Sequence, residues 1–160
     1  MTIVLPRTVG VASEDELLVV ELTEPISPEA FLAGLSGQLP RGIVLHGAEP
    51  LADGERRIPV EAVYTLPVAP DEAAELARRA AELLAADRVE INRPIPKART
   101  TRTVDLRPYL LGIAVEGDRL RWTQSIRSTG TARPEEVLTA LGLDVGRLHR
   151  LKRERVGYQP

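Results

Sequence analysis

The segment VEAVYTLPVAPDEAAELARRAAELLAA, residues 60–86, predicts a strand that runs almost directly into a helix. Apolar and polar side chains alternate from Val60 to Val68, which is the pattern of a half-buried strand. Pro70 followed by two acidic residues is typical of a first helical turn. Alanine and leucine then recur at helical spacing to about Ala86, and this alanine-rich face should pack closely against a sheet.

The residues after this helix predict more strands and a second helix. In chain order we expect a strand at 89–95, a hairpin of strands at 113–115 and 120–126 that turns at 116–118, a helix at 134–141 closed by Gly142, and a last strand at 147–156. This order resembles a split β-α-β arrangement with an additional strand. We therefore expect an α+β fold of ferredoxin-like β-α-β units, with a mainly antiparallel sheet and helices on one face.

Residues 1–57 predict a shorter succession of a strand, a helix and a strand. Residues 17–22 (LLVVEL) predict a buried strand, a helix should begin after the cap residue Ser27 and end near Gly37, and residues 43–51 predict the next strand. We interpret 1–160 as a single domain. Within it, residues 1–57 would form part of a first half and residues 58–160 a ferredoxin-like second half.

Composition excludes several classes of protein. The chain has no cysteine, so disulfides, thiolate metal sites, iron–sulfur ligation and cysteine nucleophiles are all excluded. The N-terminal sequence MTIVLPRTVG lacks the apolar run of a signal peptide, and no window approaches the ~20 apolar residues that span a bilayer. We therefore expect a cytoplasmic protein without a membrane segment.

The net charge of −2 conceals two oppositely charged parts. Residues 1–90 carry 7 basic and 16 acidic side chains, whereas residues 91–160 carry 14 basic and 7 acidic ones. Such asymmetry favours a surface for an acidic partner, either nucleic acid or protein. The alternative is that the two parts compensate each other within the molecule.

The basic residues concentrate between residues 92 and 136, together with the only tryptophan. Lysine and arginine neutralise phosphates and an aromatic ring can stack on an unpaired base, so this combination suits single-stranded or structured RNA. Trp122 could equally be a core residue. The predicted contacts to RNA or to a protein partner are Arg93, Lys97, Arg99, Arg102, Arg107, Arg121, Trp122, Arg127 and Arg133.

The sequence gives little support for a metal site, a serine nucleophile or an anion-binding loop. The two histidines, His46 and His149, are far apart in sequence and belong to no spaced metal-binding motif. No serine lies in a Gly-x-Ser-x-Gly elbow. Residues 130–132 precede a predicted helix start at Pro134, where free N–H groups could favour an anion, but the acidic residues of the first turn could offset the helix dipole instead. We expect no metal and no cofactor.

Asp105 is the one candidate for a catalytic carboxylate. It lies between Arg102 and Arg107 in a basic stretch, and an aspartate in such a place can act as a general base or a nucleophile. The alternative is an aspartate that pairs with a nearby arginine and fixes a loop.

Three phrases resemble a known family. They are GVASEDELLVVELTEPISPEAFL at 10–32, VDLRPYL at 104–110 and GTARPEEVLTALGL at 130–143. They are similar to the radical-SAM-linked protein family, a domain of unknown function found fused to or encoded beside radical SAM proteins and often near genes of RNA metabolism. The resemblance implies a radical SAM protein as partner, and it implies that this chain starts inside the longer N-terminal part of the family.

Two functions remain open from the sequence. The first is an accessory module of a radical SAM system that binds the partner enzyme, RNA or both without catalysing a reaction. The second is an RNA-modifying enzyme in which Asp105 is the catalytic carboxylate. Because the chain has no cysteine to hold a radical SAM cluster, any radical chemistry would belong to the partner.

Overall fold

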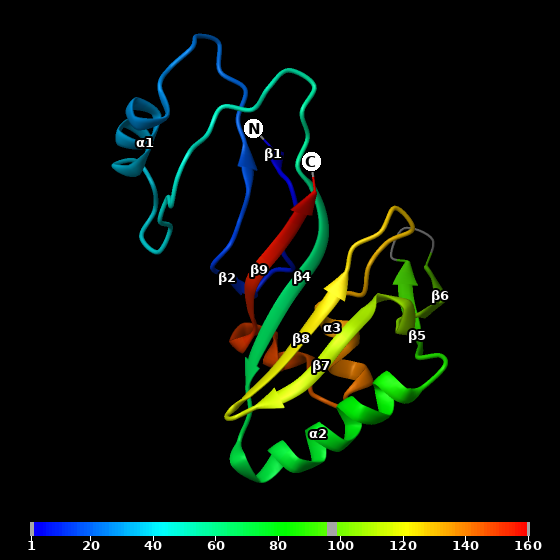
Figure 1. Cartoon of the computed structure of the whole chain (residues 1–160). Helices are drawn as coiled ribbons and strands as arrows, with labels where there is room; N and C mark the ends of the chain where they lie inside the picture. Colours follow the sequence, from blue (N-terminus) through cyan, green and yellow to red (C-terminus); the bar gives the residue numbers. More distant parts are fainter. Residues whose placement is uncertain (1, 96–98, 160) are drawn as a thin grey trace.

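The computed structural model describes residues 2–95 and 99–159. Its elements are shown in Figure 1. In chain order they are β1 (Thr2–Ile3), β2 (Ala12–Ser13), β3 (Leu18–Val19), α1 (Pro28–Ser36), β4 (Ile58–Pro67), α2 (Pro70–Ala85), β5 (Glu90–Ile95), β6 (Thr100–Asp105), η2 (Arg107–Tyr109), β7 (Leu110–Glu116), β8 (Arg119–Ser125), α3 (Pro134–Ala140), η3 (Val145–Arg150) and β9 (Lys152–Gln159).

The main sheet has five strands in the order β2-β9-β4-β8-β7. Strand β4 is antiparallel to both of its neighbours, β7 is antiparallel to β8, and the short β2 runs parallel to β9. The succession β4, α2, β7, β8, α3, β9 with the sheet order β9-β4-β8-β7 is that of a ferredoxin-like split β-α-β unit. The predicted α+β class is therefore confirmed.

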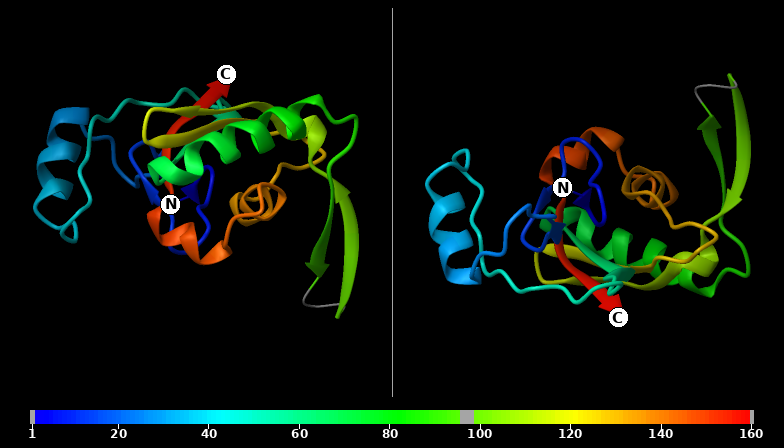
Figure 2. Two further views of the ribbon diagram at one scale, coloured as in Figure 1. Left: turned by 90° about the horizontal axis from the view of Figure 1, so that it is seen from below. Right: turned by 90° about the horizontal axis from the view of Figure 1, so that it is seen from above.

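The core lies between the sheet and its helices. Helices α2 and α3 and the turn η3 cover one face of the sheet, and no helix of the described residues covers the other, as the two views in Figure 2 show. Leucines from both layers are fully buried, among them Leu66, Leu76, Leu120 and Leu138. Tyr64 and Trp122 face each other across β4 and β8, and their stacked rings lie 5.2 Å apart between centroids.

The elements predicted between residues 60 and 142 are confirmed, with shifts of a few residues at their ends. Helix α2 starts with Pro70 and buries Leu76 and Ala80, and the hairpin of β7 and β8 turns at Gly117, whose φ of 63° favours glycine. Helix α3 is followed by Gly142 with a φ of 70°, as expected for a helix that ends in the left-handed conformation.

The strand predicted at 89–95 forms, but it belongs to a separate two-stranded sheet. Strand β5 pairs antiparallel with β6, which the sequence pattern missed, and Arg93 lies opposite Arg102. This β5–β6 hairpin is an insertion between α2 and β7, and it extends away from the main sheet (Figures 1 and 2). On the face of Arg93 and Arg102, the side chains of Ile91 and Val104 pack against the core.

The predictions of two strands before β4, at 17–22 and at 43–51, are largely wrong. Only Leu18–Val19 of residues 17–22 form a strand, and residues 43–51 form none, with Val44 71% exposed. Helix α1 does form and Ser27 caps it, but none of its residues is buried. An apolar run needs a partner strand, and the edge of β9 is occupied by β2 instead. Residues 20–57 therefore form an arm beside the body (Figure 1).

The end of the chain holds the N-terminal segment against the sheet. The last strand starts later than predicted, because residues 145–150 form η3 and only β9 enters the sheet. Arg153 of β9 is 1% exposed, and its Nη2 donates to the carbonyl of Leu5 at 2.7 Å and to both carboxylate oxygens of Glu16 at 2.6 Å. Among the residues described, no helix is long and apolar enough to cross a membrane.

Helix α2 is joined to η3 by a bidentate ion pair. Arg147 donates to the two carboxylate oxygens of Glu72 at 2.7 and 2.8 Å, and the backbone N–H of Ala69 donates to the same carboxylate. These bonds, first of all the one from Arg147, lower the pKa of Glu72 to about 2. The charged form of Glu72 therefore stabilises the fold at neutral pH.

This pair should contribute to the loss of stability in acid. Because the folded pKa is below the ordinary 4.5, the contribution is complete above pH 4.5 and is lost as the pH falls towards 2. Between pH 5 and pH 2 the free energy of unfolding of the native chain should fall by about 1 kcal/mol more than that of Glu72→Gln, after allowance for screening. Urea denaturation of both proteins across this range measures the difference, and parallel pH profiles would contradict the assignment.

Candidate nucleic-acid interface

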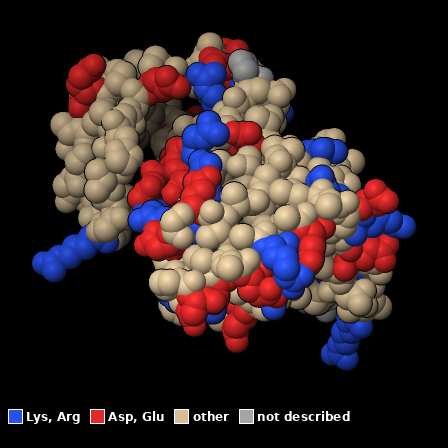
Figure 3. Space-filling view, turned by 60° about the horizontal axis from the view of Figure 1, so that its bottom comes forward, with Lys and Arg blue, Asp and Glu red and all other residues tan. Residues whose placement is uncertain are grey.

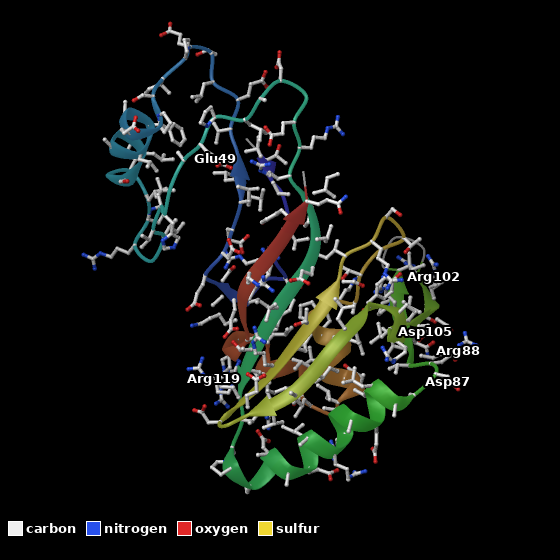
Figure 4. The ribbon with its side chains drawn as sticks, in the orientation of Figure 1. Glu49, Asp87, Arg88, Arg102, Asp105 and Arg119 are labelled. Atoms are coloured by element: carbon white, nitrogen blue, oxygen red, sulfur yellow. The ribbon has the colours of Figure 1, made fainter. Side chains whose placement is uncertain are left out.

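The exposed cations of the β5–β6 hairpin lie on β6 and the turn before it. Arg99 and Arg102 are both exposed, and no carboxylate in the described part of the chain lies within ion-pair distance of either guanidinium. Arg99 has a φ of 51° at the turn. Figure 4 shows Arg102 along the hairpin and Asp105 with Arg88 at its base. Lys97 lies outside the described residues.

Arg93, on the other strand of the hairpin, has a structural role. Its Nε and Nη2 donate to the two carboxylate oxygens of Glu136 at 2.5 and 2.7 Å, and Nη2 also donates to the carbonyl of Thr131. The Glu136 side chain is only 7% exposed and raises the pKa of Arg93 above its ordinary value. The GTARPEE phrase thus joins the hairpin to α3.

Glu136 also occupies the start of α3. Its carboxylate accepts from the backbone N–H of Arg133 at 2.8 Å, and Pro134 has no N–H to offer. The anion that the sequence suggested for this helix start is therefore supplied by the chain itself. Arg133 extends beside it, half-exposed and 4.0 Å from Glu136.

Arg107 and Arg121 also interact within the protein. The guanidinium of Arg107 donates to the carbonyls of Leu84, near the end of α2, and Leu110, at the start of β7. Arg121, on β8, lies 3.3 Å from Glu154 of β9. Arg127 is exposed, and its guanidinium carbon lies 6.0 Å from the centre of the Tyr109 ring, which is the edge of cation–π range.

Trp122 is not available for base stacking, and this part of the predicted site is wrong. Its side chain is 1% exposed on the helix-covered face of the sheet, and its indole N–H donates to Gln124. Alternation along β8 explains the error, because Trp122 directly follows Arg121 and therefore points to the opposite face of the sheet.

Basic residues elsewhere on the sheet are compensated by acidic neighbours. On the face without helices, Arg121 pairs with Glu154, Lys152 with Glu14 and Arg155 with Glu61. On the side seen in Figure 3, basic and acidic side chains are likewise interspersed. Arg99 and Arg102 differ from these residues, because both are exposed and neither is paired within the part described.

The surroundings of Asp105 are those of a structural carboxylate. Its Oδ1 accepts from the backbone N–H groups of Val89 at 2.8 Å and Arg107 at 3.0 Å. These bonds, the one from Val89 foremost, lower the pKa of Asp105 below its ordinary value. A carboxylate with a lowered pKa and an engaged oxygen is a weaker base at neutral pH.

Metal and small-molecule sites have no support among the described residues. No group of three or more histidine, aspartate or glutamate side chains there could hold a metal ion. A hollow of about 320 Å³ lies beside the N-terminal segment and includes Glu16, Glu49 and Arg57 in its wall. These groups already pair, Glu16 with Arg153 and Glu49 with Arg57, and none of the predicted site residues lines this hollow.

Removing Arg93 should destabilise the protein strongly. Arg93→Ala leaves the buried carboxylate of Glu136 without its counter-charge, which should lower the free energy of unfolding by about 3 to 5 kcal/mol. Arg78→Ala is the matched control, because Arg78 also pairs with two glutamates, Glu75 and Glu82, but on the exposed side of α2, where ion pairs contribute little. Equal losses in chemical denaturation would refute the structural role of Arg93.

Two substitutions at Asp105 should have different effects. Both backbone N–H groups donate to Oδ1, an atom that asparagine retains as its amide oxygen and alanine lacks. Asp105→Ala should lower the free energy of unfolding by about 1 to 3 kcal/mol, whereas Asp105→Asn should stay close to the native value. Thermal and urea denaturation compare the two. If Asp105→Ala is as stable as the native chain, the structural assignment fails.

Comparison with known proteins gives a family and no function. The family model described as "Uncharacterized protein conserved in bacteria (DUF2344)" matches residues 1–136, which include the β5–β6 hairpin and Glu136. No curated protein and no solved structure matches the chain. The match covers most of the 160 residues, and the chain therefore belongs to the DUF2344 family.

Proposed function

We propose that the chain is a non-catalytic module that binds RNA through the β5–β6 hairpin. The observation that carries the proposal is the pair Arg99 and Arg102, two exposed guanidinium groups on a projecting two-stranded ribbon with no described carboxylate in reach. Exposed, uncompensated arginines attract phosphate, and binding them releases counterions from the nucleic acid.

The surroundings of the ribbon favour contacts to the RNA backbone over contacts to bases. The only tryptophan is buried, and the nearby Tyr109 lies partly buried beside Arg127. Base-stacking platforms need accessible aromatic rings. We therefore expect weak sequence preference and affinity that falls steeply with salt. Arg127 and Arg133 extend the basic surface, since Thr131 between them is bonded to Arg93 of the hairpin.

Charge reversal on the ribbon should weaken this binding. We expect Arg99→Glu/Arg102→Glu to bind a labelled single-stranded RNA at least about tenfold more weakly than the native chain at low salt. Because two phosphate contacts are removed, the negative slope of log affinity against log salt should also become smaller in magnitude by about 1.4. Fluorescence anisotropy across a salt series measures both quantities.

The matched control is Arg41→Glu/Arg56→Glu. These two arginines are also exposed and without a described ion pair, but they lie on the irregular segment that follows α1. The control changes the net charge equally, so a loss in both variants would mean that only overall charge matters and would refute the ribbon as the interface. No binding by the native protein at low salt would refute the RNA proposal as a whole.

The resemblance to radical-SAM-linked proteins adds a partner to this proposal. We infer that the module presents its RNA to a radical SAM protein, which would supply the chemistry that a chain without cysteine cannot. Calorimetric titration with a radical SAM protein from the same organism measures the contact. No heat of binding at roughly 100 μM would remove the partner and leave the RNA proposal to its own test.

A further inference from the structure

Strand β7 leaves one edge of the main sheet open. It is the outermost of the five strands, and within residues 2–95 and 99–159 its ladder runs to β8 alone. The other edge is different, because β2 has only two residues there. An open strand edge presents unpaired N–H and C=O groups that can pair with another strand. Apart from one bulge near its start and Glu116 at its end, β7 has none of the usual protection, since LLGIAVE contains no lysine or proline.

The surface beside this edge is also uncharged. Helix α2 packs on β7, and on the side where Arg79 donates to the carbonyl of Leu141 it faces α3. The exposed alanines Ala74, Ala77 and Ala81 lie on the opposite side of the helix, next to the open edge. The left view of Figure 2 shows α2 and the strands above it from this side, with the hairpin leading away.

The two ends of the open edge carry opposite charges. Arg107 is held at the start of β7 by its hydrogen bond to the carbonyl of Leu110, and Glu116 is exposed at the end of the strand. Neither has an ion-pair partner within the described residues. An antiparallel copy of the same edge would bring each acidic end to a basic start, so the edge is electrostatically complementary to itself.

We propose that β7 is a dimer interface that takes β7 of a second copy of this chain in antiparallel pairing. A two-fold axis perpendicular to the sheet would join the two five-stranded sheets into one of ten strands. Because the axis keeps both helix layers on one face, the uncharged sides of the two α2 helices would meet next to the paired strands. Glu116 of each copy would lie towards Arg107 of the other.

This dimer is independent of the proposed binding of RNA, although it would affect its geometry. The β5–β6 hairpin precedes the start of β7, and antiparallel pairing sends the two starts to opposite ends of the joined strands. Seven residues at about 3.4 Å per residue separate these ends by roughly 20 Å. One assembly would then present two basic ribbons.

Sedimentation velocity of the full chain tests the interface. The native protein should sediment at twice the chain mass of 17.5 kDa at roughly 100 μM. Leu111→Lys and Glu116→Lys should each weaken the dimer at least about tenfold. The first places a charge beside the open edge, where Leu111 is 54% exposed, and the second sets a cation against Arg107.

Two matched controls and a cross-link complete the experiment. Leu22→Lys and Glu29→Lys make the same changes at exposed positions on the arm and should leave the dimer intact. Since the chain has no cysteine, Ala114→Cys introduces a single thiol on β7, and a short bismaleimide should join two copies. A monomer at every concentration would overturn the proposal, and so would a dimer that the control substitutions weaken as much as the β7 substitutions do.

Discussion

The carboxylate of Glu136 determines where the basic hairpin stands. A buried charge is stable only when it is paired and hydrogen-bonded, and this one is satisfied by Arg93 from β5 and by the backbone N–H of Arg133 before α3. The same group therefore starts the second helix of the core and fixes the base of the hairpin. Without it, β5 and β6 would join the body mainly through Ile91 and Val104.

The elements that the sequence predicts well are those that bury apolar residues in the core. Helix α2 repeats apolar residues at helical spacing because one of its faces packs on the core, and β4 is mainly apolar because its middle residues, 62–66, are buried. Strand β6 (TTRTVD) gives no such signal, because it pairs with a single strand and four of its six residues are exposed. The apolar run at 43–51 gives the opposite error: it predicts a strand that does not form, because within the described residues it has no strand to pair with.

The sequence locates the basic stretch of the candidate interface, but it does not show which residues of that stretch are exposed for binding. Counting arginines finds the basic stretch, whereas the partner that engages each arginine is distant in the chain. Arg93 meets Glu136 across 43 positions and Arg121 meets Glu154 across 33. No local pattern reveals such pairs, so structural arginines and exposed ones look alike until the chain is folded. Trp122 illustrates the same limit, because the sequence does not distinguish a tryptophan of the core from one on the surface.

The charge asymmetry along the chain has a structural explanation. This explanation reduces the number of basic residues that are left to form the interface. Much of the basic surplus after residue 90 neutralises the acidic part before it, through ion pairs that join Glu14 to Lys152, Glu16 to Arg153, Glu61 to Arg155 and Glu72 to Arg147. Strand β9 and η3 are thus basic because they pack against acidic segments. The arginines of the hairpin take no part in this exchange, because Arg93 pairs with Glu136, which also lies after residue 90, and four of the six residues of β6 are exposed. Arg99 and Arg102 therefore have no acidic partner within the described residues, unlike Arg147, Arg153 and Arg155, which join the two parts of the chain.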